Sequence, residues 1–462
     1  MAPLRLLHAI HDFLPRYQAG SELYALELGR ELARRHRVTI LCADYDPSSA
    51  HGDLVWRLHD GLPVVEIVNN WVCGSFADTY RSPMIGDRLR HVLRAIQPDV
   101  VHVHNLMNLS FELPALARAA GIPVVATLHD YTLVCPSGGQ RIHRADRHVC
   151  HEIDVDRCAR CFKESTFHTK MSLGLVAAAP APVRSLAGAA RRRLPALTGR
   201  LAAAAPQSAG WRIEPQDITR RLAAARDAWQ QIDLFVAPSA SIAREYERLG
   251  IAPSRIRVSD YGFPPLEPAS EAPAAPRTGP VRIGYVGTLV WHKGVHVLLD
   301  AVRSLPAGSY AVTIYGDPGV FADYAGELRA GASGLPVTFA GQFERQRAAA
   351  AYASIDVLVV PSLWLENSPL VIHEAYQAGV PVIGARIGGI QELVDDGRNG
   401  LLFDPDSAAD LARALRHVID HPARLAGFSA HLPPVKSITE DALEWEARYA
   451  EVLNSAAVGG QN

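Results

Sequence analysis

Short apolar runs alternate with longer amphipathic stretches along the first half of the chain. In the first amphipathic stretch, Ala25, Leu28 and Leu32 recur at helical spacing. The opening order of strand, helix and strand favours a parallel sheet. The apolar runs predict strands over residues 4–10, 38–41, 98–105, 123–128 and 232–239.

The same alternation restarts after a segment rich in proline and alanine. Residues 263–280 have the composition of an inter-domain linker. Apolar runs then predict strands over 281–287, 312–317, 337–341 and 357–361. We therefore expect an α/β fold of two Rossmann-like, doubly wound domains that face each other across a cleft. The expected domains are residues 1–262, with an insertion at about 135–230, and residues 281–435.

Composition and charge narrow the classes of function. The 462 residues carry a net charge of −2, with 48% hydrophobic and 20% charged residues, which is ordinary for a soluble globular protein. This charge gives no reason to expect nucleic acid as a partner. No uninterrupted apolar stretch is long enough to span a bilayer, and residues 1–10 predict a strand rather than a signal peptide. These features favour a cytoplasmic protein with reduced cysteines.

A helix start with free backbone amides follows the apolar run 357–361. Ser368 and Pro369 predict this start, with a hydroxyl N-cap and then a proline in the first turn. The amides of Leu370 and Val371 would point out of the helix, where its dipole favours an anion such as phosphate. The sequence therefore predicts an anion site here.

Two glutamates flank this anion site. Glu366 precedes it, next to Asn367, and Glu374 lies about a turn and a half into the helix. One acid before a phosphate site and one beside it suit a ligand that has sugar hydroxyls on both sides of a diphosphate. A nucleotide-sugar has that layout.

Other strand ends also carry candidate ligand-binding groups. Gly20 and Ser21 open the first predicted helix and offer a second anion site. Gly287 and Lys293 follow the strand 281–287, where the lysine offers a cation for a diphosphate.

Polar residues end two strands of the first half. His104 and Asn105 end the strand 98–105, and His129 and Asp130 follow the strand 123–128. Ligands of open α/β sheets bind beyond the carboxyl ends of the strands, so these four residues could line a cleft. His102, inside its strand, is expected to be a satisfied interior side chain.

The pair Glu366 and Glu374 resembles the Glu-x7-Glu signature of retaining GT-B glycosyltransferases, and its surroundings resemble family 4 of that group. The resemblance continues through residues 378–382, Gly388-Gly389, 392–394 and 397–402. Residues 287–294 resemble the family's Gly-Arg-x4-Lys-Gly stretch, with Thr288 where an arginine is usual. The C-terminal residues 436–462 would, by resemblance, form a helix that crosses back to the first domain.

The resemblance implies transfer of a sugar from a nucleotide-sugar to a glycan or lipid-linked acceptor, with retained anomeric configuration and no metal or covalent nucleophile. Bacterial surface polysaccharide synthesis is the commonest setting of such sequences. The implied acceptor-side residues are His104, Asn105, His129 and Asp130, and the implied catalytic residues are His129, Lys293, Glu366 and Glu374. The implied donor-binding residues are Gly20, Ser21, Gly287, Thr288, Lys293, Gly316, Gly341, Glu366, Asn367, Ser368, Leu370, Val371 and Glu374.

Two other functions stay open at this point. A related GT-B-like enzyme, such as a sugar-nucleotide epimerase or a phosphorylase, would need no second acceptor. A non-catalytic binding module built around the cysteines would not need the loops at Gly287 and Glu366.

Four cysteines fall within one short insertion. Cys135, Cys150, Cys158 and Cys161 include a Cys-x2-Cys pair with the spacing of a metal knuckle. Four soft ligands in a reducing compartment favour a structural zinc ion, with an iron–sulfur cluster as the second choice. Unligated thiols or a disulfide pair are the alternative.

Residues 177–230 are rich in alanine, proline and arginine. The alternation of arginines with leucines is compatible with a basic amphipathic segment on an anionic leaflet, at the inner face of a membrane that presents a lipid-linked acceptor. A solvated helical hairpin or a loop is the alternative.

Overall fold

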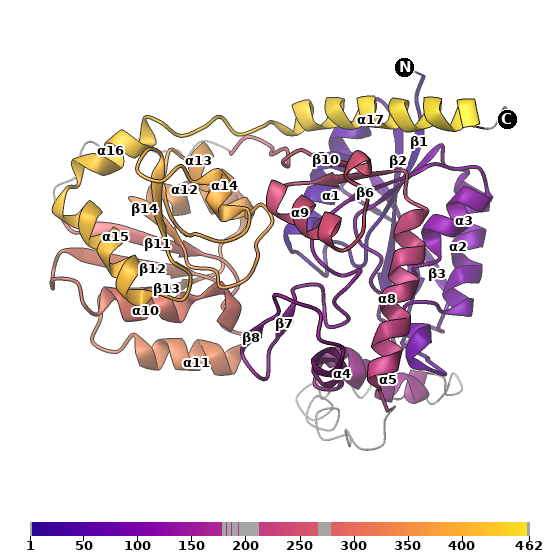
Figure 1. The fold of residues 1–462 in the computed structure, drawn as a ribbon, viewed down its shortest axis with the longest axis horizontal. Coiled ribbons are helices and arrows are strands. Elements are labelled where there is room, and N and C mark those ends of the chain that lie inside the picture. Colours follow the sequence, from indigo (N-terminus) through magenta and orange to yellow (C-terminus); the bar gives the residue numbers. More distant parts are fainter. Residues whose placement is uncertain are drawn as a thin grey trace. The chain divides into compact units, whose positions relative to one another are not determined.

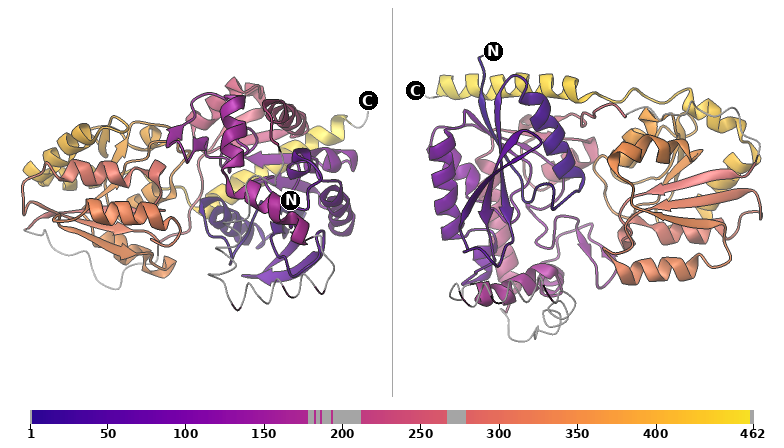
Figure 2. Two further views of the ribbon diagram at one scale, coloured as in Figure 1. Left: turned by 90° about the horizontal axis from the view of Figure 1, so that it is seen from below. Right: turned by 180° about the vertical axis from the view of Figure 1, so that it is seen from behind.

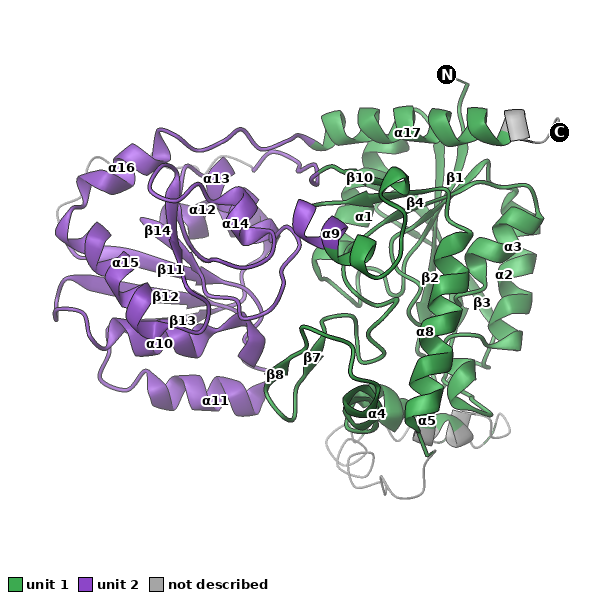
Figure 3. Ribbon diagram, in the orientation of Figure 1, with its two compact units in different colours: residues 1–238, 245–259, 438–462 green, residues 239–244, 260–437 purple. Residues whose placement is uncertain are grey.

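The computed structural model describes residues 2–177, 182, 186, 193, 212–266 and 279–459. The chain divides into two compact units (Figure 3). The first unit comprises residues 1–238, 245–259 and 438–462, and the second comprises residues 239–244 and 260–437. The division at residue 259 lies three residues before the expected boundary at 262. Residues 267–278 of the expected linker lie outside the described residues.

The first unit is built on an eight-stranded sheet with the order β10-β9-β6-β5-β1-β2-β4-β3. Neighbouring strands run parallel except β3 and β4, which pair antiparallel. A separate antiparallel hairpin contains β7 and β8. The strand bounds are β1 Arg5–Ala9, β2 Arg37–Asp44, β3 Leu54–His59, β4 Leu62–Val68, β5 Val100–Val103, β6 Val124–Thr127, β7 Ile142–His143, β8 His148–Val149, β9 Leu234–Ala237 and β10 Ile256–Val258.

Helices pack on this sheet in two groups. Helices α2, α3 and α8 contact one another in series, and α1 contacts α17 (Figures 1 and 2). The bounds are α1 Gly20–Leu32, η1 Phe76–Thr79, α2 Pro83–Ile96, α3 Leu113–Ala119, α4 Val155–Lys163, α5 Thr166–Ala177, α8 Pro215–Gln230, α9 Ala240–Arg248, η2 Pro253–Arg255 and α17 Ile438–Gly459. Among the described residues, no helix is both long and apolar enough to cross a bilayer.

The C-terminal helix α17 is part of the core of the first unit. Trp445 and Tyr449 are fully buried. The indole of Trp445 donates to the Tyr24 hydroxyl at 2.9 Å, and that hydroxyl donates to Asp441 at 2.7 Å. Burying two large aromatic rings, with their polar atoms bonded, holds this helix against α1.

The second unit is built on a six-stranded sheet that is parallel throughout, with the order β13-β12-β11-β14-β15-β16. Its strands are β11 Val281–Val286, β12 Tyr310–Tyr315, β13 Val337–Gly341, β14 Val357–Val360, β15 Val382–Ala385 and β16 Gly400–Phe403. Helices cover both faces, as the unbroken apolar run of the buried strand β14 requires (Figure 1). They are η3 Trp291–Lys293, α10 Val295–Val302, α11 Ala322–Gly331, η4 Arg345–Arg347, α12 Ala348–Ala353, α13 Leu370–Gln377, α14 Ile390–Leu393, α15 Ala408–Asp420 and α16 Ala423–Ser429.

Each sheet has a point where its strand order reverses. In the first sheet β1 lies between β2 and β5, and in the second β11 lies between β12 and β14. Loops diverge at such a point, which leaves a crevice beyond the carboxyl ends of the strands. The predicted site residues follow these strands or their neighbours.

Candidate active site

Three predicted glycines lie next to one another at the carboxyl edge of the second sheet. The amide of Gly287, after β11, donates to the Tyr315 carbonyl at 3.0 Å, and the amide of Gly316, after β12, donates to the Gly341 carbonyl at 3.1 Å. A Cβ at Gly316 would overlap the Gly287 carbonyl oxygen. The missing side chain at Gly316 therefore lets the loop after β12 pack directly on the loop after β11.

A tight turn places Lys293 over the end of β14. Lys293 closes the short helix η3, and Gly294 then adopts φ +71°. A Cβ at Gly294 would overlap the Pro361 carbonyl oxygen. Glycine is required at this position for both reasons, and its close approach fixes the lysine against the loop that follows β14.

Lys293 and Glu366 form an ion pair. Lys293 Nζ lies 2.6 Å from Glu366 Oε1, and the same oxygen accepts the Ser362 hydroxyl at 2.6 Å. Nζ also lies 5.4 Å from the centre of the Trp364 ring. The Glu366 side chain is 7% exposed and that of Lys293 is 26% exposed, so a charged pair reaches the surface at the switch point of the sheet. The sequence predicted both residues as ligand-binding groups but did not predict that they pair.

Two glycines pack against the Glu366 loop. The Gly389 amide donates to the Glu366 carbonyl at 2.7 Å. A Cβ at Gly389 would overlap the Asn367 carbonyl oxygen, and one at Gly388 would overlap the Glu366 carbonyl oxygen. Residues 388–389, which the sequence singled out only by resemblance, therefore position the backbone of the acidic loop.

We expect Gly389→Ala to destabilise the protein by about 1–3 kcal/mol through overpacking. Its backbone conformation, φ −71°, suits alanine, so the loss would come from the collision of the added Cβ with its neighbours, above all the Asn367 carbonyl. Urea denaturation measures the change. The matched control is Gly326→Ala, in the interior of α11 with open space around its Cβ, which should raise stability slightly. Equal stability of the two variants would contradict the proposed contact.

Helix α13 begins one residue later than the sequence predicted. Pro369 is the N-cap and Leu370 the first helical residue, so the prediction of Ser368 as N-cap was wrong. The Ser368 hydroxyl instead donates to Asp260 at 2.6 Å and lies 2.8 Å from His373 Nε2. The amides of Leu370 and Val371 still occupy the first turn, where a helix leaves its N–H groups without internal partners.

Glu374 lies in the same helix, beside Tyr352. The Tyr352 hydroxyl donates to Glu374 Oε2 at 2.7 Å. Burial raises the pKa of Glu374, and the hydrogen bond from Tyr352 partly offsets that rise. One carboxylate oxygen is therefore held in place by α12, which orients the other.

The first sheet carries a row of hydrogen-bonded imidazoles. His104 Nε2 lies 3.1 Å from His8 Nδ1 on β1, and His104 Nδ1 lies 3.0 Å from His129 Nε2. His102 bonds the Tyr449 and Thr127 hydroxyls, each at 2.8 Å. The prediction that His102 is a satisfied interior side chain is therefore confirmed.

These imidazoles are uncharged at neutral pH. Burial lowers the pKa of His8 and of His129 to about 3, and it lowers those of His102 and His104 to well below the usual value. A neutral ring has one N–H donor and one acceptor nitrogen. Both hydrogen bonds of the row are therefore donated either from His8 toward His129 or from His129 toward His8. Reversing them switches His129 between donor and acceptor at its other nitrogen, Nδ1.

The predicted residues beside His129 hold one another in place. The Asn105 side-chain amide donates to Asp130 Oδ2 at 2.9 Å, and the Thr132 hydroxyl donates to Asp130 Oδ1 at 2.5 Å. Burial raises the pKa of Asp130, and the bonds from Thr132 lower it in part. His104, Asn105, His129 and Asp130 all line one cavity of about 30 Å³ in the first unit.

Two matches to known families cover the two sheets. Residues 19–160 match Glycosyltransferase Family 4, and residues 280–421 match Glycosyl transferases group 1. The chain belongs to the family 4, group 1 glycosyltransferases. The predicted family is thereby confirmed.

One curated relative matches part of the chain. Glycogen synthase of Mycobacterium tuberculosis is 36% identical over 154 residues, which is 32% of this chain and 36% of that protein. The match thus spans only 36% of the length of that relative.

Solved structures share the whole fold. Sucrose-phosphate synthase from Thermosynechococcus elongatus superposes with a TM-score of 0.65 at 17% identity, over 98% of this chain and 100% of that chain. Anabaena HepE in complex with UDP-glucose superposes with a TM-score of 0.57 at 16% identity, over the same shares of the two chains. The predicted GT-B fold class is confirmed.

At the second predicted anion site, the Glu22 carboxylate accepts hydrogen bonds from groups at the start of helix α1. Helix α1 begins at Gly20, and Glu22 Oε2 accepts the Ala19 amide at 3.2 Å and the Ser21 hydroxyl at 3.1 Å. Glu22 Oε1 also lies 3.2 Å from His11 Nε2. The contribution of Gly20 and Ser21 to phosphate binding stays a prediction.

Thr288, at the position where the family usually has an arginine, is exposed. Its carbonyl accepts the Tyr285 hydroxyl at 2.9 Å. The side chain therefore supplies no cation to this edge of the sheet.

The four cysteines of the glycosyltransferase line one cavity in the first unit. Burial raises the pKa of Cys158 to about 12, and the neighbouring Cys135, Cys150 and Cys161 contribute to the rise. The assignment of these four cysteines as ligands of one metal ion stays a prediction.

The arginine-rich segment falls largely outside the described residues. Arg221, in α8, is buried and donates to the carbonyls of Thr132, at 2.6 Å, and Leu133, at 3.0 Å. Arg221 is one of the arginines of residues 177–230 that the sequence offered as a basic membrane-facing segment. Including it there was wrong, because its buried guanidinium holds the loop after His129.

Proposed function

We propose that the protein is a retaining glycosyltransferase that moves a sugar from a nucleotide-sugar donor to a glycan or lipid-linked acceptor. The observation that carries the proposal is the Lys293–Glu366 pair, 2.6 Å apart, at the switch point of the second sheet. A cation next to the helix start at Leu370 suits a departing diphosphate. The relative HepE, whose solved complex contains UDP-glucose, supports a donor of this chemical class.

In this proposal the second unit binds the donor. Lys293 and the amides of Leu370 and Val371 neutralise the diphosphate as the glycosidic bond breaks. Glu366 fixes the hydroxyls of the transferred sugar, and Glu374 accepts from the ribose through the oxygen that Tyr352 does not hold. The nucleoside would lie at the ends of β11, β12 and β13, where a Cβ at Gly341 would meet open space.

The first unit would bind the acceptor. His129 is neutral, so it would act as a hydrogen-bonding partner of the acceptor hydroxyl rather than as a cation. The row from His129 through His104 to His8 would let its outer nitrogen either donate or accept. Attack on the side that the leaving group vacates gives retention of configuration without a covalent intermediate.

A thermal-shift screen against UDP-, GDP- and ADP-sugars tests the donor. A binding nucleotide-sugar at one hundred times its Kd should stabilise the protein by about 2.7 kcal/mol. Glu374→Gln should abolish most of that stabilisation, whereas Glu344→Gln, an exposed glutamate of the same unit, should leave it unchanged. No stabilisation by any of these donors would contradict the proposal.

Product analysis separates transfer from its rivals. Release of nucleoside diphosphate that depends on an added glycan or polyprenyl-phosphate sugar supports transfer. Release of free sugar or an altered sugar-nucleotide without an acceptor would favour an epimerase, and dependence on inorganic phosphate would favour a phosphorylase. Binding without any turnover would favour a non-catalytic module.

We further propose a cytoplasmic location, with contact at the inner face of a membrane if the acceptor is lipid-linked. Synthesis of bacterial surface polysaccharide is the proposed setting. Flotation with liposomes tests the contact, and binding that does not depend on anionic lipid would contradict an arginine-mediated one.

A further inference from the structure

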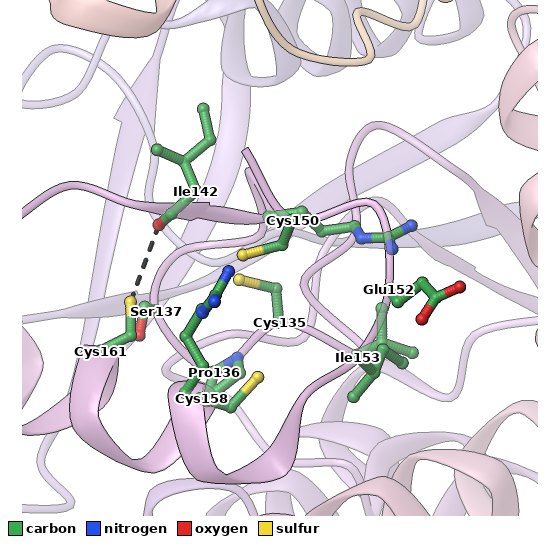
Figure 4. Close-up of a pocket in the computed structure, with 12 residues that line it drawn as sticks. Cys135, Pro136, Ser137, Ile142, Cys150, Glu152, Ile153, Cys158 and Cys161 are labelled. Carbon is green, nitrogen blue, oxygen red and sulfur yellow. Dashed lines mark hydrogen bonds between the residues drawn. The ribbon is translucent and has the colours of Figure 1, made fainter. Parts of the chain in front are cut away.

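Four cysteines from three separate elements meet at one cavity of the first unit (Figure 4). Cys135 comes from the loop after β6, Cys150 follows β8, and Cys158 and Cys161 lie on α4. The two helical cysteines are three residues apart, which places them on one face. None of these residues belongs to the sites described for donor or acceptor.

Hydrogen bonds within the chain hold the frame that presents the four thiols. The Cys150 amide donates to the Arg141 carbonyl at 2.8 Å, next to the β7–β8 pairs. Asp154 caps α4 by accepting the Arg157 amide at 3.0 Å. The Cys135 amide donates to the Tyr131 carbonyl at 2.7 Å. The backbone positions of the cysteines are therefore set by the fold itself.

The size and charge of the cavity suit a single ion inside a cage of thiolates. Its volume is about 20 Å³, enough for one water-sized occupant and too small for an organic ligand. Arg141 and Arg157 line it beside Glu152. Arg157 Nε is buried and has no hydrogen-bond partner among the described residues, so a donor next to the cavity awaits an anionic acceptor.

We propose that Cys135, Cys150, Cys158 and Cys161 bind one structural zinc ion. Four thiolates satisfy the tetrahedral preference of zinc at Zn–S distances of about 2.3 Å. The four thiols release four protons on binding, which leaves a site of net charge −2 next to the unpartnered Nε of Arg157. A disulfide would join only two of the four thiols, and the metal analysis below distinguishes zinc from an iron–sulfur cluster.

Binding requires the thiols to turn toward one point. In the described part of the chain, three or more possible metal-ligating atoms lie within 4.8 Å of one another at His8, His102 and His104. The four cysteine sulfurs do not form such a group. Cys161 Sγ contacts the Ile142 carbonyl at 3.7 Å (Figure 4). That thiol contact is lost when Cys161 is deprotonated, which frees the sulfur to rotate about χ1. In Figure 4 the sulfurs of Cys135 and Cys150 already point toward each other.

The ion would fix the loop that carries the acceptor-side residues. Cys135 follows His129 and Asp130 by only a few positions, and its amide bonds the Tyr131 carbonyl. The Gly139 carbonyl accepts the Tyr131 amide at 2.8 Å, which ties the same loop to the cysteine segment. Zinc is thus a brace for this loop and takes no part in the transfer reaction.

Metal analysis of the full chain tests the site. Protein expressed in zinc-supplemented medium and purified without chelator should contain one zinc per chain. Cys135→Ser and Cys158→Ser should each lose it, whereas Cys73→Ser, a free cysteine outside the cavity, should keep it. Because a cavity variant could fail to fold, wild-type protein stripped of metal is also titrated with Co²⁺ and followed by its visible absorption.

The expected cobalt spectrum has thiolate-to-metal charge-transfer bands and saturates at one ion per chain, and added Zn²⁺ should abolish it. Zinc below stoichiometry together with no cobalt bands would overturn the proposal. Stoichiometric iron with acid-labile sulfide, or a mass deficit of two hydrogens per disulfide in unreduced protein, would also overturn it. These readouts do not depend on glycosyl transfer.

Discussion

Lys293→Ala is expected to lower kcat for sugar transfer by a factor of about 10² to 10³, the usual loss when a group that stabilises developing negative charge is removed. The lysine has two tasks in the proposed mechanism. It neutralises the departing diphosphate, and at 2.6 Å it also holds Glu366 Oε1. Without it the buried carboxylate would keep the Ser362 hydroxyl but have no countercharge.

Initial rates with the donor identified by thermal shift measure this loss, and far-UV circular dichroism checks the fold. Arg398→Ala is the matched control, because it removes an exposed cation of the same unit that pairs with Asp395 at 3.5 Å. It should leave kcat unchanged. A Lys293→Ala enzyme as fast as the Arg398→Ala enzyme would remove lysine from the mechanism.

Glu366→Gln separates the charge of the glutamate from its hydrogen bond to Ser362. The amide can still accept from Ser362 but cannot pair with Lys293. If the two residues act as a unit, the double variant should be little slower than Lys293→Ala, so the two losses should not add.

The second large effect concerns stability in acid. Folding keeps His8 and His129 unprotonated down to a pKa of about 3, and it also lowers the pKa of His102 and His104. An unfolded chain binds protons to these residues as the pH falls through about 6.5, so the unfolded state gains stability over that range. Between pH 7 and pH 5 each such histidine should lower the free energy of unfolding by about 2 kcal/mol.

Urea denaturation of His8→Asn and wild-type protein at pH 7 and pH 5 measures one of these contributions. The variant should lose less stability across this interval than the wild type, because it has one protonation site fewer in the unfolded chain. His91→Asn, a change at an exposed histidine, should show the wild-type dependence. Asp12 opposes the trend, since burial raises its pKa to about 6, but it is present in all three proteins and cancels in the comparison. An unaltered pH dependence in His8→Asn would contradict the prediction.

The sequence predicted the class of the fold because fully buried parallel strands such as β14 are continuous apolar runs. It predicted no elements for residues 46–97 and so missed β4, although that strand is a largely buried apolar run. In the same range the edge strand β3 is partly exposed, and α2 carries polar residues among its apolar ones. Such segments take their structure from pairing with β4 and packing on the sheet. Local periodicity does not report those contacts.

The candidate site was predictable as single residues and less so as contacts. Lys293 and Glu366 are 73 positions apart, and only the order of the strands brings them together. His8 was missed because it lies inside an apolar strand, although a histidine on each of two adjacent strands, β1 and β5, was an available signal. Ser368 was misassigned because its partners, Asp260 and His373, compete with the capping bond.

The hydrogen bond between Tyr449 and His102 has a practical consequence for dissecting the protein. A fragment that stops at residue 259 would lack the aromatic rings that shield two imidazoles, and its sheet would open to water on one side. Chimeras made with other glycosyltransferases should accordingly transplant residues 438–462 together with the first unit, although these residues follow the second unit in the sequence.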